Sequence, residues 1–341
     1  MIKDLYIENF KCFNKIKIYD IKKINFLVGK NNSGKTTILE ALMLILSESR
    51  INVIENIKTI SRFKENKTEI KTLFYNFDYN NNINFNYNKY DNTSYNINIS
   101  PVLKDNKIPK DDNIELNYNT IINNDDSASI EEKKLNIPNI NNTIYMMNKK
   151  TDNVGNREET YITSNIEYNT LTAYLIEILK NKDEEPIIEM LSFFNKNIKA
   201  ISVLNNDIYI NIEGMNKLVI LNLMGEGLKK YLSIILPIAA NRNNVILADD
   251  IASSLDNETA KYLFKSILNL SRNNDMQMFF TINNYETLKL LYETVNDSEE
   301  FNDIKDSINI INISNTEEEG FKSYNYNVDS AREFVENNSN Q

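Results

Sequence analysis

Residues 24–46 constrain the fold of this chain more than any other segment. They read as an apolar strand, a glycine-bounded loop and an apolar helix, INFLVGKNNSGKTTILEALMLIL. Residues 29–36 match the Walker A pattern G-x-x-x-x-G-K-[ST] at every fixed position. The two glycines let the backbone bend so that its N–H groups face a phosphate, and the helix that follows adds the positive end of its dipole. The segment therefore predicts a loop that binds a nucleoside triphosphate, placed between a buried strand and a helix.

The Walker A pattern also assigns roles to individual residues. Lys35 is expected to reach the β- and γ-phosphates, and Thr36 is expected to ligate Mg²⁺. The residues predicted to surround the nucleotide are Gly29, Lys30, Asn31, Asn32, Ser33, Gly34, Lys35, Thr36 and Thr37. The chain has only seven glycines, and four of them, Gly29, Gly34, Gly225 and Gly227, fall in two short motifs. Glycine is thus concentrated where a backbone approaches a ligand.

Composition sets the broad class of the protein. With 341 residues, of which 41% are hydrophobic, the chain is expected to form one large domain, or a domain with an insertion. No signal peptide is expected, and no apolar run approaches the roughly 18 residues that a membrane span needs. The single cysteine, Cys12, excludes an internal disulfide and fits a reducing compartment. We therefore expect a cytoplasmic protein without a membrane partner.

The chain contains no histidine, which excludes several catalytic classes at once. Ser-His-Asp and Cys-His catalysis, HNH-type nuclease chemistry and histidine-based zinc sites are all ruled out. Catalysis must therefore rely on Lys, Asp, Glu, Ser or Thr together with Mg²⁺. The net charge of −10 argues against a surface that coats nucleic acid, although it leaves room for a local basic patch. Binding of nucleic acid is not indicated.

Periodicity gives the order of the elements. It predicts strands over residues 4–10, 12–19, 198–204 and 208–212, and helices over residues 170–180 and 186–194. Between residues 74 and 99, apolar residues alternate with asparagine (Phe74/Asn76, Ile83/Phe85/Tyr87, Ile97/Ile99), which predicts strands with asparagine on the solvent face. Residues 101–160 show the least periodicity and are expected to be flexible or inserted. The predicted parts are residues 1–100, an insertion at 101–164, and residues 165–341.

A second chemical motif lies at residues 244–251, NVILADDI. Four apolar residues followed by two carboxylates are typical of a Walker B strand, which presents an aspartate to Mg²⁺ at its carboxyl end. Asp249 is the expected metal ligand, and Asp250 stands where a general base could polarise the attacking water. An ordinary strand followed by an acidic turn is the alternative for this segment taken alone. Its place after a Walker A loop favours Walker B.

A third motif, LMGEGLKKY at residues 223–231, opens a helix about twenty residues before the Walker B strand. Gly225, Glu226 and Gly227 leave a helix N-terminus accessible, and such an N-terminus is a potential phosphate contact. A simple strand-to-helix turn is the alternative for this segment.

The chain resembles ABC-type ATPases of the SMC, RecF and OLD group, which are AAA-family proteins. The resemblance rests on the order of six segments: FKCF, GKNNSGKTT, MGEG, VILADD, IASSLD and MFFTINNYE. The chain looks closest to short bacterial ATP-binding proteins encoded beside nucleases in defence loci. The resemblance covers residues 1–50 and 165–341. It implies an α/β fold, a P-loop NTPase of the ABC ATPase type with a mixed or parallel core sheet flanked by helices, an N-terminal antiparallel β subdomain and an inserted segment.

The resemblance also implies cofactors and partners. ATP and Mg²⁺ would be bound, and the MGEG signature would cap the γ-phosphate of a neighbouring subunit's ATP, which implies a head-to-tail homodimer. The D-loop of the family would fall on residues 254–256, and its switch-histidine segment on residues 281–286. A separate effector protein, a nuclease or toxin, is the expected partner. No coiled-coil heptads are visible in the sequence, which argues against a long-armed chromosome-organising ATPase.

Three departures from the family pattern affect hydrolysis more than binding. The catalytic glutamate is replaced by Asp250, one methylene shorter, and misplacement on this scale can cost about 10²-fold in rate. The switch histidine becomes Asn283, which can hydrogen-bond a γ-phosphate but cannot carry a proton. Met224 stands where related signatures offer a polar side chain. We therefore expect intact binding of ATP with weak turnover, in which Asp250, Lys35 and Asn283 are the catalytic candidates.

Three functional hypotheses follow. The first is an ATP hydrolase that dimerises around Mg²⁺·ATP and controls an effector protein that acts in anti-phage defence. The second is a near-inactive scaffold whose ATP-bound dimer restrains a nuclease. The third is a RecF-like DNA-repair clamp. A GTPase is disfavoured because no N-K-x-D base-reading motif is present, and a transporter ATPase would need a separate membrane subunit.

Overall fold

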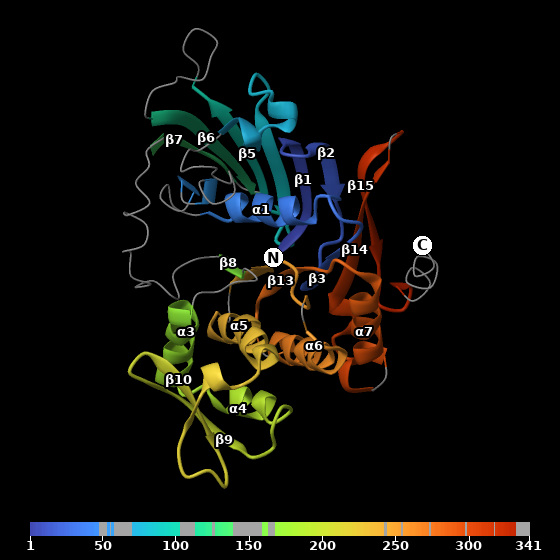
Figure 1. Ribbon diagram of the computed structural model, residues 1–341. Coiled ribbons are helices and arrows are strands. Elements are labelled where there is room, and N and C mark those ends of the chain that lie inside the picture. The colour runs from blue at the N-terminus through green and yellow to red at the C-terminus, as the bar shows by residue number, and fades with distance from the viewer. Residues whose placement is uncertain are drawn as a thin grey trace. The chain divides into compact units, whose positions relative to one another are not determined.

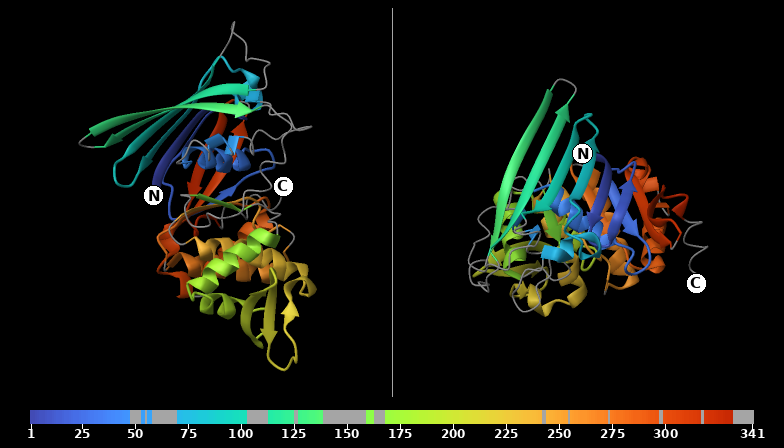
Figure 2. Two further views of the ribbon diagram at one scale, coloured as in Figure 1. Left: turned by 90° about the vertical axis from the view of Figure 1, so that its left-hand side faces the viewer. Right: turned by 90° about the horizontal axis from the view of Figure 1, so that it is seen from above.

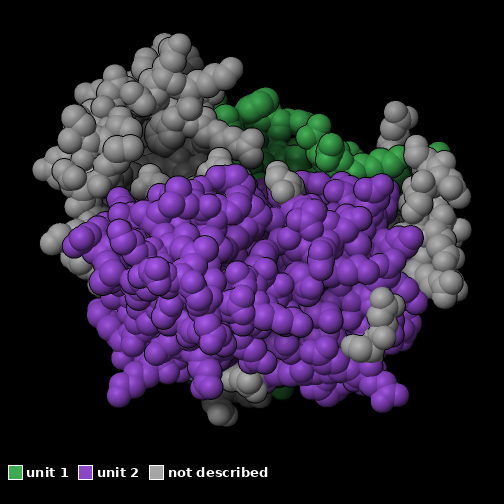
Figure 3. All heavy atoms as spheres, turned by 60° about the horizontal axis from the view of Figure 1, so that its bottom comes forward, with its two compact units in different colours: residues 1–150, 309–326 green, residues 151–308, 327–341 purple. Residues whose placement is uncertain are grey.

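The computed structural model describes residues 1–47, 53–54, 56–57, 70–102, 113–124, 127–138, 159–162, 168–241, 244–253, 255–272, 274–296, 299–316 and 318–331. The chain divides into two compact units, coloured separately in Figure 3. Unit 1 comprises residues 1–150 and 309–326, and unit 2 comprises residues 151–308 and 327–341.

Unit 1 is built on a six-stranded antiparallel sheet whose strong twist is visible in Figure 2. Its strands, in spatial order, are β2 (Phe13–Ile18), β1 (Ile2–Phe10), β4 (Ile83–Lys89), β5 (Ser94–Pro101), β6 (Asn113–Asn124) and β7 (Ser127–Pro138). Alternate residues such as Ile7, Phe85 and Ile97 are buried on one face. The opposite face carries asparagines, and Asn98 Nδ2 donates to Asn84 Oδ1 at 2.7 Å across β5 and β4. The predicted alternation of apolar residues and asparagine is confirmed for β4 and β5.

The buried face of this sheet lies against helix α1 (Lys35–Ile45), which follows strand β3 (Ile24–Val28) (Figure 1). Every residue of β3 is buried, as expected for a strand covered on both faces. The hydroxyl of Tyr118 in β6 donates to the carbonyl of Leu44 in α1 at 3.0 Å. Within unit 1, β3 also has β14 (Ile308–Thr316) as a neighbour, and β14 pairs antiparallel with β15 (Gly320–Tyr326). The predicted strand, loop and helix around the Walker A motif are confirmed.

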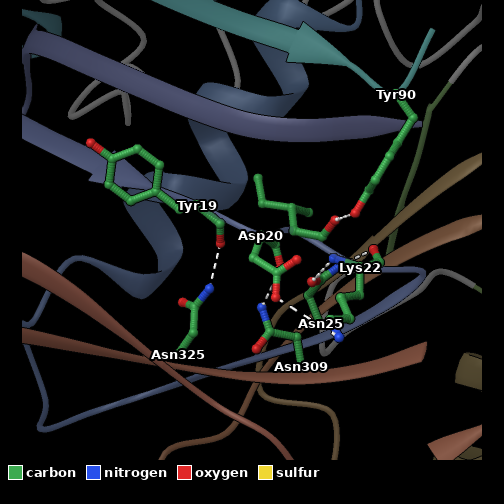
Figure 4. Close-up of polar contacts among 8 residues, drawn as sticks. Tyr19, Asp20, Lys22, Asn25, Tyr90, Asn309 and Asn325 are labelled. Atoms are coloured by element: carbon green, nitrogen blue, oxygen red, sulfur yellow. Dashed lines mark hydrogen bonds and ion pairs between the residues drawn. The ribbon is translucent and has the colours of Figure 1, made fainter. Parts of the chain in front are cut away.

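The segment that leads into β3 is anchored by side chains from distant parts of unit 1 (Figure 4). Tyr90 Oη donates to the carbonyl of Ile21 at 2.8 Å, and Asn309 Nδ2 donates to the carbonyl of Asp20 at 2.8 Å. Asn325 donates to the carbonyl of Tyr19. These bonds satisfy carbonyls that belong to no strand, and they fix the point at which the chain enters the strand that carries the Walker A loop.

The side chain of Asn25, the second residue of β3, closes this entry turn. It is fully buried, its Oδ1 accepts the N–H of Lys22 at 2.8 Å, and its Nδ2 donates to the carbonyl of Lys22 at 2.7 Å. A buried polar side chain of this kind specifies one backbone conformation, because any other conformation would leave its amide unpaired.

Two predictions for unit 1 are wrong. Residues 74–76 are not a strand: they lie at the 3₁₀ turns η1 (Ile70–Leu73) and η2 (Tyr75–Phe77), where Asn76 and Phe77 adopt φ of 52° and 59°. The expected lack of regular structure in residues 101–160 fails for β6 and β7, which form a long hairpin. In β7 only Leu135 is buried among the residues whose burial is described, so a predominantly polar sequence hid the strand periodicity.

Unit 2 combines a parallel sheet with a small antiparallel one. Strands β8 (Glu159–Ile162), β12 (Val245–Ala248) and β13 (Gln277–Thr281) are parallel, with β12 between the other two. The small sheet contains β9 (Ile198–Leu204), β10 (Asp207–Ile212) and β11 (Val219–Ile220). The helices are α3 (Tyr168–Lys180), α4 (Glu185–Leu191), α5 (Glu226–Ala240), α6 (Asn257–Arg272) and α7 (Tyr285–Asn296), with 3₁₀ turns η4 (Leu221–Leu223), η5 (Glu299–Phe301) and η6 (Lys305–Ser307).

The elements predicted for unit 2 agree with the structure. Helices α3 and α4 confirm the two predicted helices, and Pro186 lies in the first turn of α4 as expected. Strands β9, β10 and β12 confirm the other predictions. Among the described residues, no helix is both long and apolar enough to cross a membrane. The architecture is mixed α/β, as predicted.

Candidate nucleotide site

The Walker A loop begins where β3 ends, and its shape requires glycine at residue 29. Gly29 has φ of +143°, and a Cβ at this position would collide with the carbonyl oxygen of Ile313 in β14 and lie 2.8 Å from Ser33 Oγ. An L side chain is therefore excluded both by backbone conformation and by space. The close approach that the structure shows at Gly29 is to the neighbouring strand β14 and to Ser33, and approach to a ligand stays a prediction.

Gly34 is required for a similar reason at the other end of the loop. Its φ is +93°, and a Cβ would collide with the ring of Phe13, with Cε1 only 2.7 Å away. Helix α1 starts at the next residue, and its N-cap Gly34 provides no side-chain hydrogen bond to the helix N-terminus. A helix N-terminus without a side-chain cap is suited to an anion.

Lys35 lies inside the loop. Its side chain is buried, and Nζ donates to the carbonyl of Gly29 at 2.8 Å and to that of Lys30 at 3.0 Å. The ammonium thus holds the start of the loop against the start of α1. A bound phosphate would give this ammonium a stronger, charge-assisted acceptor.

The loop also offers an unsatisfied hydroxyl. Ser33 Oγ is buried and has no hydrogen-bond partner among the described residues. A buried polar atom without a partner costs free energy, so its retention indicates a role for a ligand or ordered water. A phosphate oxygen would satisfy it. Lys30, Asn31 and Asn32 are exposed, so the outer side of the loop is accessible. These observations fit a bound nucleoside triphosphate.

The carboxylates of unit 2 follow β12, and a threonine from the neighbouring strand organises them. Because Ala248 pairs with Phe280 in the parallel register, Asp249 and Thr281 come next on adjacent strands. Thr281 Oγ1 donates to Asp249 Oδ1 at 2.5 Å and accepts the backbone N–H of Asp250 at 2.7 Å. One fully buried hydroxyl therefore fixes both the predicted metal ligand and the backbone of the predicted general base.

Asp250 has an unusual backbone conformation. Its φ is 54°, in the left-handed region that Asp and Asn tolerate better than other L residues but that still carries a cost. Residues held in such conformations by their surroundings cluster at functional sites. Here the bond from the Asp250 N–H to Thr281 helps to hold the conformation, and it turns the chain directly after Asp249.

A cation of helix α5 lies in the electrostatic range of this pair. Lys230 is half-buried, and burial lowers the pKa of its ammonium while the Asp250 carboxylate counteracts that decrease. The sequence interpretation placed Thr281 in the expected switch segment but missed its role beside Asp249 and Asp250. For Thr281 a signal existed: it is the polar residue that ends an apolar strand, the same pattern that singled out Asp249 at the end of β12.

The remaining predicted site residues lie on other elements of unit 2. Gly225 is the N-cap of α5 with φ of −56°, and a Cβ there would meet no atom of the described chain within 4 Å. Asn283 is exposed in the loop after β13, where Asn284, rather than Asn283, accepts the N–H of Thr287 at the start of α7. Within the expected D-loop, Ser254 lies outside the described residues.

Asp256, also in the expected D-loop, caps helix α6. Its Oδ1 accepts the N–H of Thr259 at 2.9 Å and its Oδ2 accepts the Thr259 hydroxyl at 2.7 Å. Both bonds favour the carboxylate, so they hold the pKa of Asp256 below its ordinary value.

Comparison with known proteins places the chain in a family. The sequence model of the family described as "AAA domain, putative AbiEii toxin, Type IV TA system" matches residues 24–281, which is more than half of the chain and includes both the Walker A and Walker B segments. The chain belongs to this AAA domain family. The resemblance to SMC- and RecF-like AAA ATPases is thereby confirmed.

Individual relatives extend the comparison of this AAA protein. An "ATP/GTP phosphatase" of Helicobacter pylori is 25% identical over 335 residues, covering 88% of this chain and 90% of the relative. The DNA replication and repair protein RecF of Clostridium acetobutylicum is 49% identical, but only over 41 residues, 12% of this chain and 11% of RecF. A solved SMC head bound to the C-winged helix domain of ScpA aligns with a TM-score of 0.51 at 14% identity, covering 97% of this chain and 99% of that one, which supports the predicted P-loop NTPase fold.

Proposed function

We propose that this AAA protein binds Mg²⁺·ATP, dimerises around it and hydrolyses it to control a separate effector. In this proposal Lys35 and Thr36 bind the nucleotide at the Walker A loop, and Asp249 supplies a ligand to Mg²⁺. The observation that supports it best is the Walker A loop, which has two glycines at which a Cβ would collide with neighbouring atoms, a buried ammonium, and a buried hydroxyl with no hydrogen-bond partner among the described residues. The family match spans both the Walker A and the Walker B motif, which supports assigning nucleotide chemistry to each of them.

The chemistry assigned to each residue follows from its groups. Mg²⁺ supplies, when bound, charge stabilisation to the β- and γ-phosphate oxygens. Thr36 and Asp249 offer the hard oxygen ligands that this ion prefers. Lys35 stabilises negative charge that develops on the transferred phosphoryl group. Asp250 accepts a hydrogen bond from the attacking water and orients it, while the amide of Asn283 donates to the γ-phosphate.

Dimerisation is assigned to the segment from Gly225 to Gly227. Nothing described in the chain requires glycine at residue 225, since its φ is ordinary and the space for a Cβ is open. A glycine without an internal reason is consistent with close approach by another molecule. Leu223, two residues earlier, is 79% exposed, as expected for a side chain that a partner covers.

The dimer can be tested by sedimentation velocity with and without Mg²⁺·ATP. We expect ATP to convert the wild-type protein from monomer to dimer, and Gly225→Arg to remain monomeric because the new side chain blocks the approach. Asn216→Arg adds the same charge at another exposed position and is expected to dimerise normally. A Gly225→Arg variant that still forms the ATP-dependent dimer would contradict this assignment.

A near-inactive regulator is the second candidate, and the geometry of residue 250 favours it. Asp250 is shorter than glutamate and sits in a left-handed conformation, so its carboxylate must reach the water from an unusual backbone position. Single-turnover phosphate release separates the two candidates. If the wild-type protein releases phosphate and Asp250→Ala does not, the result supports the enzyme. If the wild type and Asp250→Ala both bind ATP but release phosphate only at the background rate, the result supports the scaffold.

The effector and the biological role are also part of the proposal. The family description gives the AAA domain itself as a putative toxin of a type IV toxin–antitoxin system. A separate nuclease or toxin partner and a role in defence belong to the proposal alone. A nuclease or toxin gene beside this gene would support that role. The local match to RecF keeps the DNA-repair clamp as an alternative, which predicts ATP-dependent DNA affinity with a steep salt dependence. If DNA binding depended neither on ATP nor on the salt concentration, the clamp would be excluded.

A further inference from the structure

The turn between β1 and β2 contacts the Walker A loop and its helix. Phe10 pairs with Phe13 across the two strands, so Lys11 and Cys12 form the tip of the hairpin. Lys11 has φ of 49°, and its backbone N–H donates to the carbonyl of Leu73 at 2.8 Å, which holds the tip in one conformation. The edge of the Phe13 ring packs against Phe321 of β15, with ring centroids 4.8 Å apart. The turn is therefore a rigid part of unit 1.

Lys11, Cys12 and the first residue of β2, Phe13, each touch a different part of the nucleotide loop or α1. Lys11 Nζ forms an ion pair with Glu40 Oε2 at 2.7 Å. Cys12 Sγ donates to Thr37 Oγ1 at 3.6 Å. The Phe13 ring fills the space in which a Cβ of residue 34 would lie.

The ion pair is well placed to control the start of α1. Glu40 follows Thr36 by four residues and Thr37 by three, so all three side chains lie on one face of the helix. A link at Glu40 therefore fixes the rotation of α1 about its axis, and with it the direction of the Thr36 hydroxyl and of the helix N-terminal N–H groups. The side chains of Lys11 and Glu40 are only 15% and 7% exposed, so the pair is shielded from solvent.

The pair also has an electrostatic role. A buried carboxylate one turn from a loop that binds a polyphosphate would repel that ligand if it were not neutralised. Lys11 provides a neutralising charge through its ion pair with Glu40. We infer that Lys11 is a positioning residue for nucleotide binding, which acts through Glu40 to set the orientation of α1 and to cancel the negative charge beside the phosphate loop. This inference rests on the proposed binding of ATP at the Walker A loop.

The positioning role of Lys11 can be tested by equilibrium binding of a fluorescent ATP analogue to variants in which Lys11 and Glu40 are replaced together. Lys11→Met alone leaves Glu40 buried without its cation and is expected to destabilise the protein, so the informative variant is Lys11→Met/Glu40→Met, which replaces both charges by apolar groups of similar length. We expect this variant to fold with near-normal stability and to bind ATP about tenfold more weakly, equivalent to about 1.4 kcal/mol. The exchanged pair Lys11→Glu/Glu40→Lys is expected to recover most of the affinity.

The single cysteine gives a second measurement that does not depend on activity. Because Cys12 contacts Thr37, loosening of α1 is expected to increase the rate at which a maleimide labels Cys12 in the double variant, and ATP is expected to protect it in the wild-type protein. Lys199→Met/Glu213→Met removes an exposed ion pair of unit 2 and serves as the control.

Wild-type affinity and labelling rate in the folded Lys11→Met/Glu40→Met variant would overturn the inference. If that variant does not fold, the exchanged pair decides: wild-type affinity supports the inference, and affinity no better than that of a Lys35→Ala variant overturns it. A wild-type protein that does not bind ATP would instead overturn the proposed function, so the two failures are distinguishable.

Discussion

The hydroxyl of Thr281 donates a hydrogen bond to the carboxylate of Asp249 on the neighbouring parallel strand, with 2.5 Å between Thr281 Oγ1 and Asp249 Oδ1. The same Thr281 oxygen accepts the backbone N–H of Asp250 at 2.7 Å. The hydroxyl thus uses both its donor and an acceptor position within the carboxylate motif. This bond makes the orientation of the proposed metal ligand depend on a residue 32 positions later in the chain.

Replacement of Thr281 tests this dependence. Thr281→Val keeps the shape but leaves a carboxylate oxygen and an N–H without their partner, so we expect a loss of about 1–3 kcal/mol in the free energy of unfolding. ATP turnover is expected to fall by up to about 10²-fold because Asp249 and Asp250 are no longer held. Thr281→Ser keeps the hydroxyl and is expected to retain most of both properties. Urea unfolding and steady-state phosphate release measure the two effects, and equal behaviour of the two variants would contradict the role of the hydroxyl.

Gly34 and Gly225 are expected to differ sharply in their tolerance of alanine. Gly34→Ala introduces a methyl group against the buried Phe13 ring at a φ of +93°, so a loss of stability of about 1–3 kcal/mol and a loss of ATP binding are expected. Gly225→Ala meets open space at an ordinary φ and is expected to change the stability of the monomer by less than about 0.5 kcal/mol. Thermal unfolding of both variants, measured without nucleotide, checks the contrast. Equal destabilisation by the two substitutions would contradict it.

Asp256 gives a prediction that depends on pH. Asp256→Ala removes the N-cap of α6 and is expected to cost about 1 kcal/mol of stability at neutral pH. The pKa of Asp256 is held below its ordinary value of 3.8, so the cap contributes fully above that value and is lost as the pH falls through the pKa of the folded state. The stability difference between wild type and variant should therefore narrow below about pH 4. A difference that is constant between pH 7 and pH 3 would show that the carboxylate charge is irrelevant.

Much of this fold follows from local patterns in the sequence. The Walker A segment predicts its strand, loop and helix because the apolar runs and the two glycines impose a single arrangement on the chain. Strands β9 and β10 and helices α3 and α4 show clear periodicity. These elements depend mainly on which of their own residues face the core.

Other features could not be predicted because they depend on partners far away in the chain. The contact between Phe13 and Gly34 requires the hairpin and the loop to meet in three dimensions. The bond between Thr281 and Asp249 requires a particular register between β12 and β13. In β7 polar side chains occupy most positions, and the burial of Leu135 alone gave too weak a pattern to reveal the strand. In β6 the buried residues Leu116, Tyr118 and Thr120 alternate with polar ones, so a strand pattern existed and the sequence interpretation missed it.

The dependence of ATP affinity on Mg²⁺ tests the central claim most directly, because the claim is that this protein binds Mg²⁺·ATP with Lys35 as a phosphate contact and Asp249 as a metal ligand. Affinity should be measured by titration calorimetry with Mg²⁺ and with a chelator, for wild type, Lys35→Ala and Asp249→Asn. We predict that Lys35→Ala weakens binding by about 10- to 100-fold in both conditions, because it removes a charged hydrogen bond to phosphate. Asp249→Asn should weaken binding only when Mg²⁺ is present. The account would be contradicted if the ATP affinity of Asp249→Asn depended on Mg²⁺ as strongly as that of the wild type. It would also be contradicted if Lys35→Ala bound ATP with wild-type affinity.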